Sequence, residues 1–354
     1  MGIQNNNKAI LITPLNWGLG HATRCIPVIN KLLQYGYCPI IASDGDALEL
    51  LAKEFPDLKT LELPSYQIEY SKKGKNFKWK LLFSIPKIIR AVIKERKTVN
   101  QWIDEYQITG IISDNRLGCY SAKVTSIYMT HQVTILSGRT TWLSSCIHQY
   151  FIKKYSECWV PDDQKEYGLA GELSHPLNTK LKLKYLSPLS RFKKELLPKK
   201  YDLTIVLSGP EPQRGILDTI LQKEVKNYNG KVLYIKGILE KEQKTTQMGN
   251  ITFFNFMESS QLEKALNATE IILCRSGYTS IMDLDKLEKK AFFIPTPGQY
   301  EQEYLALKLE QEGIAPYANQ EDFNIKDLDR ISLYKGFKNK NEMINWEVLF
   351  SVFD

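Results

Sequence analysis

Short apolar runs alternate along the whole chain with longer segments in which apolar residues recur at helical spacing. This alternation is typical of βαβ units and indicates parallel sheets with helices on their faces. The strands expected in the first half are 9–13, 37–42, 58–63, 108–113, 126–130 and 158–160. Those expected in the second half are 203–207, 231–235, 251–254, 271–274 and 291–294. The two series predict an α/β protein with two doubly wound domains.

The segment 174–200 separates the two series of strands. It contains three prolines and many lysines, so a continuous helix is unfavourable there. We therefore predict a first Rossmann-like domain over 1–189 and a second over 200–335. In such sheets ligands bind beyond the carboxyl ends of the strands, so the loops that follow the strands are the candidate functional segments.

Composition and cysteine usage narrow the class of protein. The chain has 354 residues, enough for about two domains, and its 43% hydrophobic and 25% charged residues are ordinary for a folded protein. The six cysteines form no CxxC pair and the four histidines lack metal-ligand spacing, so we expect reduced thiols and no metal. No signal peptide pattern and no run of 18 apolar residues occurs, which predicts a cytoplasmic protein.

The turn after the first expected strand contains Gly18, Gly20 and His21 ahead of an amphipathic helix. Glycines let the backbone turn tightly and approach a ligand, and a helix N-terminus offers free N–H groups. Histidine titrates near neutral pH, which suits proton transfer. The alternative is a tight turn with a capping histidine.

Three loops of the second half carry residues suited to a phosphorylated sugar. The small and cationic residues of the first two loops are Ser208, Gly209, Arg214, Ser276, Gly277 and Thr279. Backbone N–H groups and a guanidinium can hold a phosphate at such turns, and Asp283, two helical turns on, could accept from a ribose diol. The polar side chains of the third loop, 295–306, suit sugar hydroxyls. Plain βα turns and a solvated first helical turn are the alternatives.

The order of these motifs resembles the GT-B nucleotide-sugar glycosyltransferases, most closely the family 28 type represented by MurG. CRSGYTSIMD (274–283), PTPGQ (295–299) and EQEYLALKLEQEGIA (301–315) occur in family order and spacing, and GLGHATR (18–24) fits the family's N-terminal glycine-rich loop. The resemblance covers most of the chain and is concentrated in the second domain. It implies two facing Rossmann-like domains with a cleft between them, and a last helix, 339–354, that returns to the first domain.

The resemblance also implies a nucleotide-sugar site. Its residues would be Arg191, Ser208, Gly209, Arg214, Phe256, Met257, Arg275, Ser276, Gly277, Tyr278, Thr279, Asp283, Gln299, Glu301 and Gln302. Serines, glycines and arginines of this set would lie near the phosphates. Asp283 takes the position of the ribose-binding acid, and Glu301 with Gln302 would hold the donor sugar. Phe256 and Met257 would lie against the nucleotide base.

The sequence departs from the family pattern at several positions, so it does not determine the identity of the donor sugar or of the acceptor. The family has Glu where this chain has Asp283, and a Gln-Gln pair where it has Glu301 and Gln302. The loop 208–214 is less glycine-rich than its family counterpart. The segment 130–133 resembles the acceptor-side segment only loosely, so we expect an acceptor other than that of MurG.

Two residues compete for the role of the base that takes the acceptor proton, His21 and Asp114. We hypothesise that His21 is the base or orients the acceptor, while Asp114 with Arg116 lines the acceptor cleft. Asp114 could instead cap a helix beside a stabilising arginine. The expected acceptor-side residues are Gly18, Gly20, Asn115, Arg116 and His131. The D-x-D triplets 44–46 and 283–285 fit a turn and a helix, so no metal is expected.

The segment 72–97 accounts for the chain's net charge of +7. It holds ten Lys and Arg residues and one Glu, a net of +9, which leaves −2 for the rest of the chain. Its apolar residues have helical spacing from Ile85 onward. This pattern fits a helix on an anionic membrane surface or, equally, a core helix with a solvated basic face. No nucleic-acid motif is present, so no nucleic-acid partner is expected.

Taken together, these features predict an inverting hexosyltransferase. It would move a sugar such as N-acetylglucosamine from a UDP-sugar to a lipid-linked or cell-envelope glycan acceptor. We expect no cofactor, and a location in the cytoplasm or on the inner face of the membrane. Two alternatives are a UDP-sugar 2-epimerase and a non-catalytic membrane-surface protein that binds a nucleotide or glycan.

Overall fold

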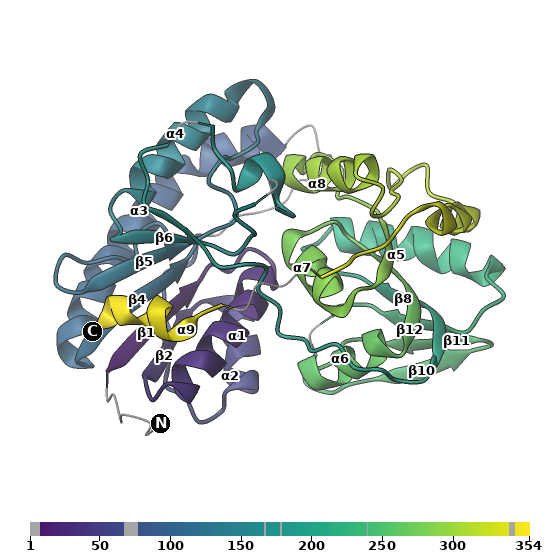
Figure 1. Cartoon of the computed structure of the whole chain (residues 1–354), viewed down its shortest axis with the longest axis horizontal. Helices are drawn as coiled ribbons and strands as arrows, with labels where there is room; N and C mark the ends of the chain where they lie inside the picture. Colours follow the sequence, from purple (N-terminus) through teal and green to yellow (C-terminus); the bar gives the residue numbers. More distant parts are fainter. Residues whose placement is uncertain (1–7, 67–76, 166–167, 178, 239, 340–343) are drawn as a thin grey trace. The chain divides into compact units, whose positions relative to one another are not determined.

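The computed structural model describes residues 8–66, 77–165, 168–177, 179–238, 240–339 and 344–354, with only the backbone described for 77–85. The chain divides into two compact units. The first contains the described residues of 8–189, apart from 77 and 78, together with 344–354. The second contains the described residues of 190–339, with 77 and 78. Figure 1 shows the elements of each unit.

The first unit is built on a seven-stranded parallel sheet with the order β3-β2-β1-β4-β5-β6-β7. The strands are β1 (Ala9–Pro14), β2 (Cys38–Ser43), β3 (Thr60–Glu62), β4 (Ile108–Asp114), β5 (Thr125–Met129), β6 (Glu157–Val160) and β7 (Leu183–Tyr185). The strand order reverses direction at β1, the arrangement of a doubly wound sheet. The short edge strand β7 lies outside the strands predicted from the sequence.

Helices cover both faces of this sheet. They are α1 (Gly20–Gln34), α2 (Gly45–Glu54), α3 (Phe77–Glu105) and α4 (Thr141–Ile152). Right-handed crossovers place α1 and α2 on one face and α3 and α4 on the other, as Figure 1 shows. On the α3 face, Leu11 and Ile111 of the sheet pack with Val99 and Ile103 of the helix.

The second unit has a six-stranded sheet with the order β10-β11-β9-β8-β12-β13. Its strands are β8 (Tyr201–Val206), β9 (Val232–Ile235), β10 (Thr245–Met248), β11 (Ile251–Phe254), β12 (Thr269–Cys274) and β13 (Lys290–Phe293). Its helices are α5 (Gln213–Glu224), α6 (Ser259–Asn267), α7 (Tyr278–Leu287) and α8 (Tyr300–Gln311). All strands are parallel except the exposed edge strand β10, which pairs antiparallel with β11 and was not predicted.

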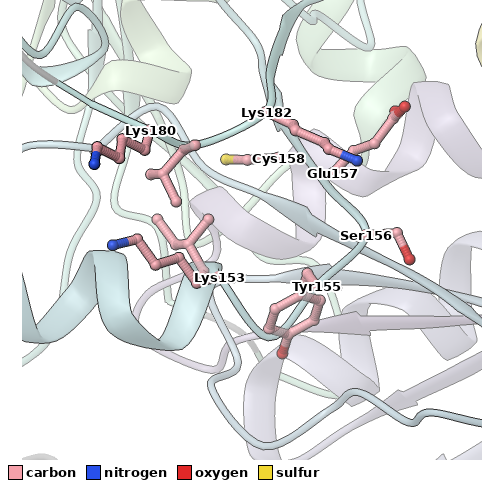
Figure 2. A pocket seen from close by; sticks show the side chains of 9 residues that line it. Lys153, Tyr155, Ser156, Glu157, Cys158, Lys180 and Lys182 are labelled. Carbon is pink, nitrogen blue, oxygen red and sulfur yellow. The ribbon is translucent and has the colours of Figure 1, made fainter.

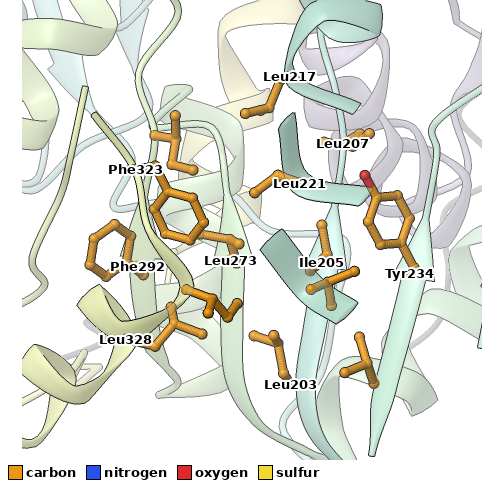
Figure 3. Packing of buried hydrophobic residues seen from close by; sticks show 14 of the residues in the cluster. Leu203, Ile205, Leu207, Leu217, Leu221, Tyr234, Leu273, Phe292, Phe323 and Leu328 are labelled. Carbon is orange, nitrogen blue, oxygen red and sulfur yellow. The ribbon is translucent and has the colours of Figure 1, made fainter. Parts of the chain in front are cut away.

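The core of the second unit lies between its sheet and the helix α5. Leu203 and Ile205 of β8 pack with Leu217 and Leu221 of the helix (Figure 3). Burial of such side chains stabilises a fold by about 1.5–3 kcal/mol each. A packed sheet holds the loops beyond its strands in fixed positions. The α/β fold class predicted from the sequence is confirmed.

The C-terminal stretch belongs to the first unit. The helix expected over 339–354 is shorter in the structure, because α9 spans Trp346–Phe350 and a 3-10 turn follows. The Phe350 ring lies 5.7 Å from that of Tyr37 and 6.3 Å from that of Trp159. Among the helices that the structure describes, none is both long and apolar enough to cross a membrane.

Candidate functional site

The loops after β1 and β4 bring two candidate residues of the first unit together. β1 and β4 are neighbours in register, with Pro14 opposite Asp114, so both loops leave the same edge of the sheet. Gly18 has φ of +75°, a conformation that side-chain-bearing residues rarely adopt, and it leads into α1. His21 stands in the first turn of that helix, and Asp114 is the last residue of β4.

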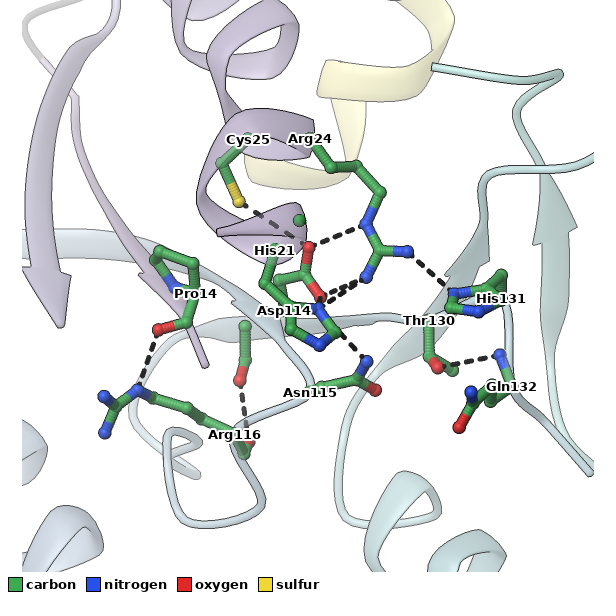
Figure 4. Close-up of polar contacts among 12 residues, drawn as sticks. Pro14, His21, Arg24, Cys25, Asp114, Asn115, Arg116, Thr130, His131 and Gln132 are labelled. Carbon is green, nitrogen blue, oxygen red and sulfur yellow. Dashed lines mark hydrogen bonds and ion pairs between the residues drawn. The ribbon is translucent and has the colours of Figure 1, made fainter. Parts of the chain in front are cut away.

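A hydrogen-bonded cluster joins these residues, as Figure 4 shows. His21 Nδ1 lies 2.9 Å from Asp114 Oδ1. Arg24 donates from Nε to Asp114 Oδ2 at 2.8 Å, and its Nη2 also contacts Asp114 Oδ1. Arg24 Nη1 lies 2.8 Å from His131 Nδ1, and Asn115 Nδ2 lies 3.4 Å from His21 Nδ1.

Asp114 is held as a carboxylate inside the first unit. Burial opposes its ionisation, but the charges of Arg24 and His21, together with their hydrogen bonds, outweigh burial and lower the pKa of Asp114 to about 2. A carboxylate only accepts hydrogen bonds, so a hydrogen bond with Asp114 has its proton on His21 Nδ1, although Arg24 Nη2 also lies 3.0 Å from that nitrogen. In the neutral ring with this tautomer, Nε2 carries the lone pair that can take a proton.

Exposure separates the two candidate bases. The Asp114 side chain is fully buried, whereas 16% of the His21 side chain is exposed. A base must reach the proton that it abstracts. The structure therefore favours His21 as the base, with Asp114 orienting its ring, over a direct role for Asp114 at the acceptor.

Arg24 is the residue of this cluster that the sequence analysis missed. It is buried, and it joins Asp114 to His131. Its position three residues after His21 puts both side chains on one face of α1, which was the available signal. His131 is also buried, so its predicted place on the acceptor side changes to a partner of Arg24.

The prediction that Arg116 lines the acceptor cleft is wrong. Arg116 is fully buried, and its guanidinium donates to Glu95 at 2.6 Å and to the backbone oxygen of Pro14 at 2.9 Å. It also contacts Asp44 and the backbone oxygen of Pro64. Its donors are taken up inside the first unit, so Arg116 ties α3 and the loop after β2 to β4.

Three neighbouring loops of the second unit meet at the carboxyl edge of its sheet. They follow β8, β12 and β13, which are adjacent in the order of strands. They contain the predicted residues Ser208, Gly209, Arg214, Arg275, Ser276, Gly277, Tyr278, Thr279, Gln299, Glu301 and Gln302. Phe256 and Met257 follow β11, farther along the same edge, and both are partly exposed. The structure thus gathers most of the predicted set on one edge.

The loop after β8 contains a glycine with free space around it, Gly209, and leads to Arg214, whose side chain is hydrogen-bonded. Gly209 has φ of +93°, and a side chain there would meet no atom within 4 Å. Arg214 is held by Glu211, whose Oε1 lies 2.8 Å from Nη2, and by the backbone oxygen of Gly237. This turn leaves exposed backbone at the start of α5.

Arg275, a predicted contact of the nucleotide sugar, is an interior residue instead. Arg275 is buried, and its guanidinium donates to the backbone oxygens of Ile294 and Gln213 at 3.1 and 3.0 Å and to Gln320 Oε1 at 2.6 Å. Burial lowers its pKa to about 10. Arg275 is therefore corrected to a residue that holds the loops in place. The Tyr278 side chain is also buried, at the first position of α7, and its place in the nucleotide site stays a prediction.

Gln302 and Ser276 connect the loop after β13 to the start of α7. Gln302 is buried and its Oε1 accepts from the backbone N–H of Thr296 at 2.9 Å. The Ser276 hydroxyl donates to the backbone oxygen of Gln302 at 2.7 Å. Glu301, beside Gln302, is partly exposed, as are Gly277 and Thr279.

Asp283 lies within electrostatic reach of Arg191 and is hydrogen-bonded to Ser190. Ser190 donates from its hydroxyl to Asp283 Oδ1 at 2.6 Å. Burial raises the pKa of Asp283 to about 6, although Arg191 and the Ser190 hydrogen bond act in the opposite direction. Asp283 therefore changes charge near neutral pH.

Solved glycosyltransferases share the fold of this chain. The glycotransferase of kitacinnamycin matches with a TM-score of 0.63 and 10% identity, covering 93% of this chain and 90% of that one. Spinosyn forosaminyltransferase SpnP matches with a TM-score of 0.61 and 12% identity over 92% and 90%. MurG of Acinetobacter baumannii matches with a TM-score of 0.54 and 12% identity over 92% and 89%. The protein therefore has the GT-B fold of glycosyltransferases with two Rossmann-like domains.

For the second unit, the comparisons indicate a family as well as a fold. Residues 205–345 match the glycosyltransferase family 28 C-terminal domain. A curated relative from Haemophilus ducreyi, UDP-N-acetylglucosamine--N-acetylmuramyl-(pentapeptide) pyrophosphoryl-undecaprenol N-acetylglucosamine transferase, is 28% identical over 151 residues. That match spans 40% of this chain and 41% of the relative. The second unit is thus a family 28 C-terminal domain, and the resemblance stated from the sequence is confirmed.

The residues that the structure describes contain no group of three or more histidine, cysteine, aspartate or glutamate side chains placed to hold a metal ion. Asp44, from one of the two D-x-D triplets, is paired with Arg116. Asp283, from the other, is paired with Ser190.

Proposed function

We propose that the protein is an inverting glycosyltransferase that needs no metal. It would transfer a sugar, such as N-acetylglucosamine, from a UDP-sugar to a hydroxyl of a lipid-linked or cell-envelope glycan acceptor. The observation that carries this proposal is the pairing of buried Asp114 with partly exposed His21 in a chain whose second unit is a family 28 C-terminal domain. The transferase named for the Haemophilus ducreyi relative supports this donor and acceptor class.

The chemistry assigned to His21 is general base catalysis. Its Nε2 takes the proton of the acceptor hydroxyl while the hydroxyl oxygen attacks the anomeric carbon of the donor sugar. The bond from that carbon to the diphosphate breaks in the same displacement, which inverts the anomeric centre. UDP leaves with the electron pair of the broken bond. Asp114 keeps the proton of His21 on Nδ1 and stabilises the imidazolium that forms.

The departing diphosphate would be stabilised by the second unit. The N-termini of α5 and α7 present backbone dipoles at the carboxyl edge of the sheet. Arg191 and Arg214 supply cationic side chains there, and the partly exposed Glu301 suits a sugar hydroxyl. This arrangement supplies charge stabilisation through the protein's own groups, and no cofactor is part of the proposal.

We further propose that the protein works in the cytoplasm, at the inner face of a membrane. The part of segment 72–97 that the structure describes with side chains begins at Pro86, and residues 72–76 lie outside the described residues. On α3, Ile89 and Ile93 are 50% and 65% exposed beside Arg90 and Lys94. This mixture is compatible with an anionic surface.

The test is an assay of the purified protein with a panel of UDP-sugars, with and without a bacterial membrane extract. We expect one UDP-sugar to release UDP only when the extract supplies an acceptor. Isomerisation of the donor without an acceptor would instead indicate a 2-epimerase. Binding of UDP with neither reaction would indicate a non-catalytic protein.

Nucleotide binding should depend on the charge of Asp283. Because its pKa is raised to about 6, the carboxylate is ionised above that pH and protonated below it. Hydrogen bonds to a charged acceptor are stronger by about 1 kcal/mol, so we expect the Kd for UDP to rise about fivefold as the pH falls from 8 to 5. Calorimetric titration at each pH measures this change.

Asp283→Asn should leave only the pH dependence that comes from the terminal phosphate of UDP, whose second pKa is about 6, and should bind UDP at pH 8 about fivefold more weakly than the wild type does. The matched control is Asp322→Asn, which changes an exposed acid of the same unit and should keep the wild-type profile. A pH profile of the Kd for UDP that is the same in the wild type and in Asp283→Asn would contradict the role of Asp283.

A further inference from the structure

Arg24 and His21 share the carboxylate of Asp114. Arg24 donates from Nε to Asp114 Oδ2 at 2.8 Å and from Nη2 to Asp114 Oδ1, and His21 Nδ1 lies 2.9 Å from that same Oδ1 (Figure 4). The side chain of Asp114 is fully buried, and that of Arg24 is 1% exposed. One interior carboxylate therefore contacts two groups that can carry a positive charge.

Arg24 is the permanent one of these two counterions. A guanidinium stays protonated throughout the pH range in which proteins fold, and its parallel N–H groups match the two oxygens of a carboxylate. Burial raises the pKa of Asp114, but the charge of Arg24, followed by that of His21, lowers it to about 2. The charge of the carboxylate is thus balanced before His21 takes up a second proton.

A second proton on His21 would place two cations side by side. Arg24 Nη2 lies 3.0 Å from His21 Nδ1, and a guanidinium has no acceptor atom. The imidazolium would be attracted by Asp114 and repelled by Arg24 at nearly equal distances. Like charges at such a distance disfavour the charged form of a titrating group. The neutral ring, which is the form that can accept a proton from a substrate, is therefore favoured.

A third segment holds Arg24 in place. Its Nη1 lies 2.8 Å from His131 Nδ1, and because a guanidinium only donates, that nitrogen carries no proton. His131 is buried in the loop after β5, and Arg24 itself stands one turn after His21 on α1. The guanidinium is thus held from α1, β4 and the loop after β5, so its charge stays beside Asp114.

Titratable groups of the other elements around this cluster are neutral near pH 7. On α1, burial raises the pKa of the Cys25 thiol, whose Sγ lies 3.8 Å from Asp114 Oδ2. On β5, burial raises the pKa of Tyr128. On α4, burial lowers the pKa of His148, which lies against the Tyr128 hydroxyl, to about 4. Among the described residues, the charged groups in contact with the His21 ring are therefore the carboxylate and the guanidinium.

We propose that Arg24 is a positioning residue of the transfer reaction, a permanent counterion of Asp114 that keeps the His21 ring neutral and able to take the acceptor proton. Without Arg24, the interior carboxylate would hold a second proton on His21 as its counterion, because an unpaired buried charge is costly. The base would then already be protonated at neutral pH. This inference rests on the proposed function, since it concerns the base of that reaction.

The pH dependence of turnover in Arg24→Met tests this role. We expect the acid limb of the pH–rate profile to move to higher pH by about one unit, the usual effect of removing one neighbouring charge. At pH 6 turnover should fall about tenfold below that of the wild type, and at pH 9 it should stay within about threefold. A loss of turnover that is equal at both pH values would show a purely structural role and overturn the inference.

Two variants control for the loss of an arginine and for the loss of a positive charge. Arg24→Lys keeps a cation beside Asp114 without the paired N–H groups, so its acid limb should stay close to that of the wild type. Lys182→Met removes a cation of the same unit from the lining of a pocket of about 330 Å³ at the C-terminal end of α4 (Figure 2), and should leave the profile unchanged. An acid limb that moves as far in either control as in Arg24→Met overturns the inference.

Nitrogen NMR spectra of the imidazole rings give a readout that needs no sugar donor. The signals of His21 are assigned from their absence in His21→Ala. Between pH 5 and 9, the midpoint at which this ring gains its second proton should lie about one unit higher in Arg24→Met than in the wild type. Equal midpoints overturn the inference.

The wild-type spectra keep the test independent of variant folding. A histidine paired with a buried carboxylate alone is expected to carry two protons at pH 7, whereas with Arg24 present we expect a neutral ring with its proton on Nδ1. A doubly protonated His21 at pH 7 in the wild type overturns the inference. If the midpoint moves but no UDP-sugar is transferred, the proposed function fails and the charge relation stands. If sugar is transferred and the midpoint does not move, only the inference fails.

Discussion

His21→Ala is expected to lower the turnover of sugar transfer by about 10²–10⁴-fold, the usual contribution of a positioned general base. The Kd for UDP should stay within about twofold of the wild-type value, because His21 belongs to the first unit and the nucleotide site is assigned to the second. Initial rates of UDP release, measured with a saturating donor, give the turnover. Calorimetric titration gives the Kd.

Two further variants distinguish a base from a structural residue. Asp114→Asn should lower turnover to a similar extent, because an amide does not hold the proton of His21 on Nδ1 as a carboxylate does. His175→Gln changes another histidine of the same unit, which stacks on Tyr185, and should retain turnover within a fewfold. Wild-type turnover in His21→Ala would refute the assignment of the base.

Arg116→Met is expected to destabilise the first unit by about 3–5 kcal/mol, the cost of leaving a buried charge without its partner. The guanidinium is fully buried between Asp44 and Glu95, and Glu95 also accepts from the Tyr66 hydroxyl at 2.7 Å. Methionine fills a volume similar to that of arginine. The loss in the free energy of unfolding therefore comes from the unpaired charges of Asp44 and Glu95 and not from a cavity. All six tryptophans lie in the first unit, so their fluorescence in urea follows its unfolding.

The pH dependence of this loss has a definite sign. Burial raises the pKa of Glu95, and Arg116 acts against that rise. Without Arg116 the folded state binds the Glu95 proton more tightly than the unfolded state does. The destabilisation should therefore be smaller at pH 5 than at pH 8.

Lys123→Met provides the matched control, because it breaks an exposed pair with Asp104 and should cost less than about 1 kcal/mol. An equal, small loss in both variants would show that the buried ion pairs do not stabilise the first unit.

The α/β class and the series of parallel strands could be predicted because they depend on local patterns. A buried parallel strand appears in the sequence as a short apolar run. Each crossover adds a helix whose apolar residues recur every three or four positions. Edge strands lack this signal. β7 is three residues long and only partly buried, and β10 is fully exposed, so neither has the apolar run that marks a strand.

The sequence by itself therefore determined the two doubly wound units, the loops at the carboxyl edges of their sheets, and the family of the second unit. Only the tertiary structure decided the charge partners. Asp114 pairs with Arg24 from another segment, while Arg116, two positions from Asp114, turns to Asp44 and Glu95. β4 ends at Asp114 and Asn115 has φ of +60°, so the chain turns between the two residues and Arg116 does not follow the direction of Asp114.

The outward face of α4 is the second feature that only the tertiary structure decided. Trp142, Leu143, Ile147 and Tyr150 of this helix are 77%, 52%, 52% and 57% exposed, although the helix carries no charged residue. Its rotation is set by Ser145 and His148, whose partners come from distant segments and bind on the inner side. Burying a polar group without a hydrogen-bond partner is costly, so the contacts of Ser145 Oγ and His148 Nε2 hold this side of the helix inward, although His148 Nδ1 itself has no partner.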